Sequence, residues 1–159
     1  MTKKFIVDEI CARLLTEQKT AEAAAASARE GATHEEAKAE NQYDTRGLEA
    51  SYLAGAQAER VLKLAKSLHM FKSLVVRSYS SEDKIGITAL VEVDDGENQQ
   101  TYFLANDAGG MKISLESETI MVITPQSPVG RALMNKTLGD FIEVRVKNEV
   151  REYEISKVN

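Results

Sequence analysis

Residues 123–140 read ITPQSPVGRALMNKTLGD, and this stretch decides how the second half of the chain is interpreted. Ser127-Pro128 breaks a preceding strand pattern and begins a short helix through Leu133, with Pro128 suited to the first helical position. Gly139-Asp140 follows, and the residues after it alternate between apolar and polar side chains, as strands do. The stretch therefore predicts a sheet that is interrupted by one helix.

The rest of residues 73–159 carries further strand signals. Asp95-Gly96 predicts a hairpin turn, and Gly109-Gly110 marks a second turn. Strands are predicted at Leu74–Tyr79, Ile85–Val93, Gln100–Ala105, Lys112–Leu115, Thr119–Ile123, Phe141–Val146 and Arg151–Ile155. The aromatic side chains of this half are interpreted mainly as core residues: Tyr79, Tyr102, Phe103, Phe141 and Tyr153.

Residues 1–72 differ in composition, because Ala, Glu, Lys and Leu dominate and favour helices. Apolar residues recur at three- and four-residue steps, which indicates one apolar stripe on each of two helices. The stripe residues are Phe5, Ile6, Ile10, Leu14 and Leu15, then Leu48, Tyr52, Leu53, Ala56, Val61, Leu64, Leu68 and Phe71. We expect an antiparallel coiled-coil hairpin over 1–72, with arms of roughly 50 Å, and a separate domain over 73–159. A self-associating coiled coil is the alternative.

Net charge limits the class of partner. The chain carries −5, and the excess lies in residues 73–159, since 1–72 contain 11 basic and 11 acidic residues. An acidic chain is poorly suited to unaided DNA binding, which depends on neutralising phosphates, so we expect no sequence-specific DNA binding. The single Cys11 fits a reducing compartment and a packing role. No membrane span or signal peptide is recognised, and we expect a cytoplasmic protein.

The turn of the hairpin, residues 30–49, concentrates acidic side chains. Gly31 can end the first helix, and Thr33 with Glu36 fits a capping box. A helix that starts at Thr33 would place Glu36, Glu40 and Asp44 on one face, and Gly47 would lie in its interior at a cost of about 1 kcal/mol.

Carboxylates in such an arrangement suit Mg²⁺, which is held by one or two carboxylates together with waters and phosphates. We therefore name Glu36, Glu40 and Asp44 as candidate acting residues, with Glu35 in reserve. A solvated acidic face with no further role is the alternative. His34 and His69 have no second His or Cys nearby and are interpreted as solvated or capping residues, so we expect no stable metal site in the isolated chain.

The stretch SPVGRAL with Gly139-Asp140 and the final hairpin, preceded by a helical hairpin, resembles the GreA/GreB family of transcript-cleavage factors. The resemblance implies an α+β chain with an FKBP-like antiparallel sheet behind the helical rod. The family's tip is similar to Gly-Asp-x-x-Glu-Asn-x-Glu-Tyr. One register aligns Glu40-Asn41 with Glu-Asn and puts Ala37 at the Asp position. A second aligns Tyr52 with the Tyr and leaves Asp44 and Glu49 each one residue out of place.

The resemblance implies that the hairpin enters the secondary channel of RNA polymerase and helps to hold a Mg²⁺ ion of the polymerase while backtracked RNA is hydrolysed. The factor would be an accessory protein, with no tightly bound cofactor of its own. It also implies RNA contact along a basic face at Arg60, Lys63 and Lys66, and polymerase docking near Gly130 and Arg131. Two alternatives stay open: a non-cleaving channel-binding regulator, and an FKBP-like or coiled-coil interaction module.

Overall fold

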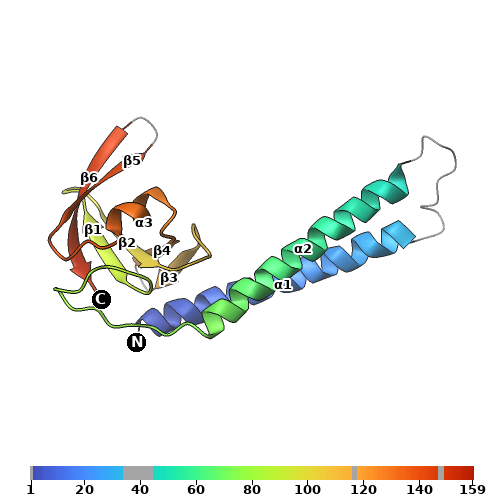
Figure 1. The fold of residues 1–159 in the computed structure, drawn as a ribbon, viewed down its shortest axis with the longest axis horizontal. Helices are drawn as coiled ribbons and strands as arrows, with labels where there is room; N and C mark the ends of the chain where they lie inside the picture. Colours follow the sequence, from blue (N-terminus) through green and yellow to red (C-terminus); the bar gives the residue numbers. More distant parts are fainter. Residues whose placement is uncertain (1, 34–44, 116–117, 147–148) are drawn as a thin grey trace. The chain divides into compact units, whose positions relative to one another are not determined.

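The computed structural model describes residues 2–33, 45–115, 118–146 and 149–159 (Figure 1). Its elements are α1 (Thr2–Thr33), α2 (Arg46–Lys72), β1 (Leu90–Asp94), β2 (Gln99–Leu104), β3 (Lys112–Leu115), β4 (Glu118–Ile123), α3 (Pro128–Leu133), β5 (Phe141–Val146) and β6 (Glu149–Val158). They form two compact units: residues 11–73, and residues 1–10 together with 74–159. The first ten residues of α1 thus group with the sheet, which the composition did not indicate.

The helical unit contains the rest of α1 and all of α2, which lie side by side in Figure 1. The buried residues of α1 in this unit are Leu14, Ala21 and Ala28, which recur every seven residues. A seven-residue repeat is the spacing of a coiled-coil seam. The buried side chain is leucine at position 14 and alanine at positions 21 and 28. Because alanine is smaller, the two helix backbones can approach each other more closely toward the turn.

The outer half of α2 departs from the predicted stripe. Leu48, Tyr52 and Leu53 are 56, 73 and 54% exposed, whereas the buried residues of α2 are Leu68 and Phe71 near its other end. Helical spacing alone could not reveal this difference, because the burial of a large side chain also depends on the side chains of the facing helix. In the outer part of α1 the buried residues are the small Ala21 and Ala28. The predicted stripe is correct for the inner half of α2 and wrong for the outer half.

The second unit is a six-stranded sheet in the order β3-β4-β2-β1-β6-β5. The predicted fold class is confirmed, with one difference inside the sheet: β2 and β4 pair in parallel, from Thr101 opposite Ile120 to Leu104 opposite Ile123, and the other pairs are antiparallel. One face carries the main core, made of Ile85, Ala89, Val91, Val93, Tyr102, Leu104, Ile123, Leu133, Ile142, Val144, Tyr153 and Ile155. Phe141, expected in the core, is 57% exposed.

One predicted strand is absent from the sheet, and another is shorter than predicted. Residues 74–79 form no ladder, and β1 begins at Leu90 instead of Ile85. The amide of Arg77 donates to Thr88 Oγ1 at 3.0 Å, and the Tyr79 hydroxyl donates to the carbonyl of Ile87 at 2.7 Å. Thr88 is buried at a φ of 72°, an uncommon conformation for a β-branched residue. These bonds hold residues 74–79, here called the strap, against residues 85–89, and the Thr88 N–H in turn donates to the Leu104 carbonyl of β2. Ile85 and Ala89 are thereby buried without strand pairing, whereas Val75 of the strap is 85% exposed.

Two glycines set the register at the edges of the sheet. The Gly139 N–H donates to the Ile155 carbonyl, and the Ile155 N–H donates to the Asp140 carbonyl, both at 2.9 Å. Gly110 and Met111 bond Val122 in the same way. With φ values of 82° for Gly139 and 90° for Gly110, both sites are β-bulges that require a residue with positive φ. These bulges terminate the pairing of β5 and β3 at defined positions.

The helix α3 starts as the sequence predicts. Ser127 is its N-cap and accepts from the Gly130 N–H at 3.1 Å, and Pro128 occupies the first turn. The Thr124 carbonyl accepts from the Ser127 N–H at 2.9 Å and from its hydroxyl at 2.7 Å. Gly130 lies against the same carbonyl, so close that a Cβ atom there would be 1.9 Å from the oxygen. The helix can therefore fold back over the core only if residue 130 lacks a side chain.

A cluster of cationic and aromatic groups binds the first residues of α1 to the strap. Lys3 is buried and donates through Nζ to the Arg77 carbonyl, and this Nζ lies 5.2 Å from the Tyr79 ring centroid. The Arg77 guanidinium lies 4.8 Å from the same centroid and bonds Asp83 at 2.7 Å. Burial lowers the pKa of Lys3 below its ordinary value. The N-terminal residues are thus held by a charged group that folding partly removes from water.

We expect Gly130→Ala to destabilise the sheet unit by about 2–4 kcal/mol, because the new Cβ must displace backbone atoms in a tightly packed turn. Urea unfolding followed by circular dichroism measures the change. Gly55→Ala is the matched control: its Cβ would meet no atom within 4 Å, and α2 should gain up to about 1 kcal/mol. A Gly130→Ala variant as stable as the parent would contradict the close approach.

Lys3 should make stability depend on pH in the alkaline range. Its pKa is lower in the folded than in the unfolded state, so the unfolded state binds more protons between the two values and stability rises with pH there. The parent should therefore gain stability relative to Lys3→Met as pH rises toward the ordinary lysine value of about 10.4. Urea unfolding of both proteins between neutral pH and that value measures the difference. A difference that is constant with pH would contradict the burial of this ammonium group.

Candidate functional site

The hairpin tip contains the candidate carboxylates, and Glu35, Glu36, Glu40 and Asp44 all lie outside the described residues. His34, beside them, also lies outside. The helix ends that flank the tip are described, and they differ from the helix start at Thr33 that was assumed when Glu36, Glu40 and Asp44 were placed on one face. The assignment of acting residues therefore stays a prediction from the sequence.

The two helix ends differ from the predicted ones. Thr33 is the last residue of α1, and its hydroxyl donates to the Arg29 carbonyl at 3.0 Å, so it cannot be the N-cap of the second helix. The helix also continues through Gly31. The second helix starts at Arg46, which places Gly47 in its first turn instead of its interior. The helix start assumed for the single-face argument is therefore wrong.

Thr45 and Glu49 form the described beginning of α2. The Thr45 hydroxyl donates to Glu49 Oε1 at 3.0 Å, and the Glu49 N–H donates to the Thr45 carbonyl at 2.9 Å. A carboxylate in the first turn is also stabilised by the helix dipole. Glu49, one of the two carboxylates of the second motif register, thus has a structural role at the helix end.

The exposed apolar residues of α2 lie next to the tip in sequence. Leu48 and Tyr52 are four residues apart, which places them on one side of the helix, and Leu53 is adjacent. Tyr52 is the residue that the second register aligns with the family's tyrosine. The outer hairpin therefore presents an aromatic ring and two leucines to its surroundings, together with the acidic sequence of the tip.

The basic face on α2 is present as predicted, with one qualification. Arg60, Lys63 and Lys66 are all exposed at steps of three residues. The Lys63 ammonium pairs with Glu59 at 2.9 Å, with both side chains more than two-thirds exposed. Exposed pairs of this kind contribute about 0–1 kcal/mol, so Glu59 holds Lys63 only weakly. All three cations are accessible to a polyanion.

The two residues predicted to dock on a partner have different roles. Gly130 is buried and is required for packing against Thr124, as described above. Arg131 is exposed on α3 and lines a hollow of about 460 Å³ with Ala132, Met134, Lys136, Phe141, Ile142 and Glu143. Gly130 shapes this surface, and Arg131 belongs to it.

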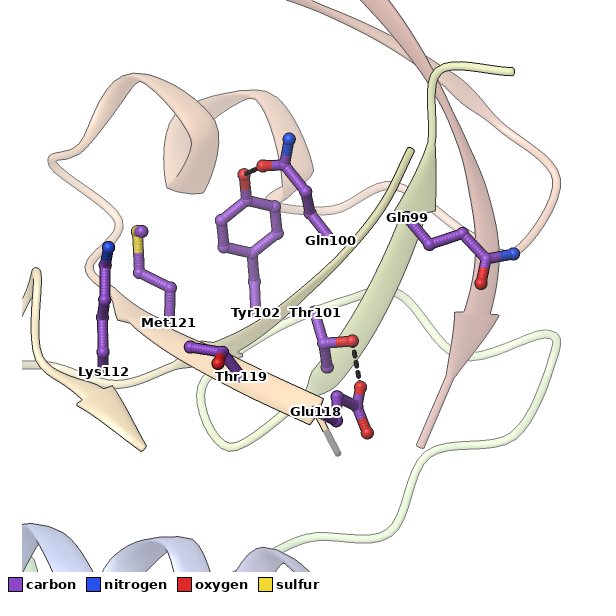
Figure 2. Close-up of a pocket in the computed structure, with 8 residues that line it drawn as sticks. All are labelled: Gln99, Gln100, Thr101, Tyr102, Lys112, Glu118, Thr119 and Met121. Carbon is purple, nitrogen blue, oxygen red and sulfur yellow. Dashed lines mark hydrogen bonds between the residues drawn. The ribbon is translucent and has the colours of Figure 1, made fainter. Parts of the chain in front are cut away.

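A second hollow, of about 420 Å³, lies over β2, β3 and β4, and Figure 2 shows the side chains that line it. The Tyr102 hydroxyl donates to Gln100, and the Thr101 hydroxyl donates to Glu118. Burial raises the pKa of Tyr102, and the nearby Tyr153 adds to this effect. Because Tyr102 is the single aromatic residue among the described lining residues and its hydroxyl is already bonded to Gln100, the hollow offers little for a prolyl-peptide substrate.

Neither metal binding nor membrane insertion is supported in the described ranges. They contain no group of three or more His, Cys, Asp or Glu side chains that could hold a metal ion. None of the helices in the described part of the chain is long and apolar enough to cross a membrane.

Comparison with known proteins assigns the chain to a family. The model for the C-terminal domain of GreA/GreB transcription elongation factors matches residues 80–159. Transcription elongation factor GreA of Clostridium botulinum strain Langeland is 30% identical over 123 residues, which is 75% of this chain and 69% of that protein. GreA of Mesorhizobium japonicum is 35% identical over 75 residues, which is 47% of this chain and 44% of that protein.

Among solved structures, GreA factor homolog 1 (Gfh1) of Thermus thermophilus aligns with 94% of this chain and 94% of its own, at 21% identity and a TM-score of 0.39. The family model spans half of the chain, and the alignment with the Clostridium factor spans more than two thirds of both proteins. The chain belongs to the GreA/GreB family of transcription elongation factors.

Proposed function

We propose that this factor binds RNA polymerase through the secondary channel and assists Mg²⁺-dependent cleavage of backtracked RNA. Membership of the GreA/GreB family is the observation that carries the proposal. The described helices support it, because two long helices on either side of an acidic tip form a rod that can reach a site inside another protein. The factor acts in the cytoplasm as an accessory protein, and the polymerase is the catalyst.

The chemistry assigns the tip a limited task. In two-metal cleavage of a phosphodiester, the metal ions stabilise the attacking and the leaving oxygens. Glu36, Glu40 and Asp44 would complete the coordination of a weakly held Mg²⁺ ion of the polymerase and orient the attacking water. The metal would be held mainly by the polymerase and the RNA phosphates, and the factor would lend carboxylate oxygens only.

A non-cleaving regulator is the second candidate, and the tip sequence is what favours it. Neither register reproduces the family's Gly-Asp-x-x-Glu-Asn motif: one puts Ala37 at the Asp position, and the other puts Thr45 there. The outer hairpin would then occupy the channel through its exposed Leu48, Tyr52 and Leu53. An FKBP-like or coiled-coil interaction module, from a different class, would require that the protein fail to bind polymerase.

The first test adds the protein to a purified backtracked elongation complex at controlled Mg²⁺ and measures transcript shortening together with binding. The double variant Glu40→Gln, Asp44→Asn should cleave at least about tenfold more slowly, because a neutral amide holds Mg²⁺ more weakly than a carboxylate. The control Glu17→Gln, Glu30→Gln removes two charges from α1 and should leave cleavage unchanged.

The outcomes of this test are distinct. Shortening that survives in the Glu40 and Asp44 variant, with binding intact, would contradict the assignment of those residues. Binding by the parent without any shortening would support the non-cleaving regulator. Absence of binding would contradict both polymerase proposals, and a peptide-proline isomerisation assay would then test the third.

The second test concerns RNA contact by α2. Replacing Arg60 and Lys63 with Glu should weaken the affinity for a stalled elongation complex about tenfold and reduce its salt dependence, because phosphate contacts release counterions. The control Lys4→Glu, Lys19→Glu makes the same charge change at exposed positions of α1. Fluorescence anisotropy across a salt series measures both. Equal affinities of the two double variants would remove the RNA contact from the proposal.

A further inference from the structure

Strand β5 ends the sheet on one side, and β6 is its neighbour in the described part of the chain. The Ile155 N–H donates to the Asp140 carbonyl, which fixes the order of the ladder. Hydrogen-bonded pairs in an antiparallel ladder alternate, so Ile142 and Val144 bond Tyr153 and Arg151. The N–H and C=O groups of the residues between them, Phe141, Glu143 and Arg145, therefore point away from the sheet.

The side chains of these three residues also differ from their neighbours. Ile142 and Val144 are 3% exposed and belong to the core, whereas Phe141, Glu143 and Arg145 are exposed. The hollow of about 460 Å³ lined by Arg131, Phe141 and Glu143 adjoins this strand. The outer edge of β5 thus combines unsatisfied backbone groups with accessible side chains and adjoining open space, which are the conditions for adding a strand.

We propose that β5 pairs with β5 of a second copy of this chain, antiparallel, around a two-fold axis at Val144. In this register Glu143 lies opposite Arg145 of the second copy, and by symmetry Arg145 lies opposite Glu143 of the second copy. Both are hydrogen-bonded pairs, so their outward N–H and C=O groups are satisfied together. Opposite charges directly across two strands are stabilising, and the interface is self-complementary, as a two-fold dimer requires.

The charges select this register over its neighbours. An axis at Glu143 would oppose two glutamates at the centre, and like charges directly opposite are destabilising. An axis at Ile142 would set Phe141 opposite Glu143 and leave Arg145 outside the paired segment. The axis at Val144 is the register of the three in which each charged side chain faces the opposite charge.

The other edge of the sheet is less suited to the same pairing. There the bulge at Gly110 leaves Lys112 and Ser114 facing outward, on a strand of four residues. Short edge strands and lysines are typical devices against pairing. A contact through six-residue β5 strands is itself small compared with standard interfaces, so we expect a weak, reversible dimer. The inference is independent of polymerase binding.

The test is sedimentation equilibrium of the full chain over a concentration series that reaches the millimolar range. Glu143→Arg and Arg145→Glu should each weaken dimerisation about tenfold, because each makes two like-charge pairs per dimer. The double variant Glu143→Arg, Arg145→Glu keeps the net charge and should restore the parental dissociation constant within about threefold. Glu97→Arg, an exposed charge change in the β1–β2 turn, should cause little change.

A cysteine experiment tests the register directly in a Cys11→Ser background. Glu143→Cys and Arg145→Cys variants should cross-link with each other when mixed and oxidised, and each alone should cross-link at least about tenfold less, since disulfides need Cα atoms within about 7 Å. A monomeric parent at every concentration would overturn the proposal. Dimerisation unchanged by both single charge swaps, or preferential cross-linking of Glu143→Cys with itself, would also overturn it.

Discussion

The contact between Gly130 and the Thr124 carbonyl determines how the sheet unit closes. Strand β4 ends at Ile123, and the next carbonyl already accepts two bonds from Ser127. The helix α3 can reverse over this carbonyl because residue 130 has no Cβ, and Leu133 then enters the core beneath it. A side chain at position 130 would lift α3 away from the face that holds Tyr102, Ile142 and Tyr153. The burial of Leu133, and with it the cover that α3 gives to this face, depends on the absence of that one atom.

The sequence predicted those elements whose signals are local. Strand-like composition and alternation predicted both ends of β3 and β5 correctly, and Ser127-Pro128 predicted the start of α3. The strap could not be found in this way, because Leu74–Tyr79 has the composition of a strand. In the structure it forms no ladder, and its bonds to Thr88 and Ile87 involve side chains. The parallel pairing of β2 with β4 was also missed. It joins strands separated by β3, and strand composition does not distinguish a parallel from an antiparallel neighbour.

The site illustrates the same division between local and non-local information. Helical periodicity located the basic face of α2 correctly, since exposed positions at steps of three follow from the helix itself. It misplaced Leu48, Tyr52 and Leu53, because burial depends on what the opposite helix offers, and the seam of α1 narrows to Ala21 and Ala28. The beginning of α2 at Arg46 was missed because Thr33, Glu36 and Gly31 form a locally plausible cap signal. For the tip carboxylates, the sequence remains the whole basis.

The two units differ in their charge. On the outer face of β5 and β6, Glu143 lies directly opposite Glu152, and Phe141 lies opposite Glu154. Like charges in register cost stability and repel phosphates. Contact with phosphates is therefore unfavourable on this face, whereas the charge-balanced hairpin has Arg60, Lys63 and Lys66 exposed on α2. The acidic unit is suited instead to protein surfaces: Arg131 and Phe141 line one hollow, and the outward backbone of β5 adjoins it. The excess negative charge therefore lies in the unit that carries the outward edge of β5, and the exposed cations lie on α2.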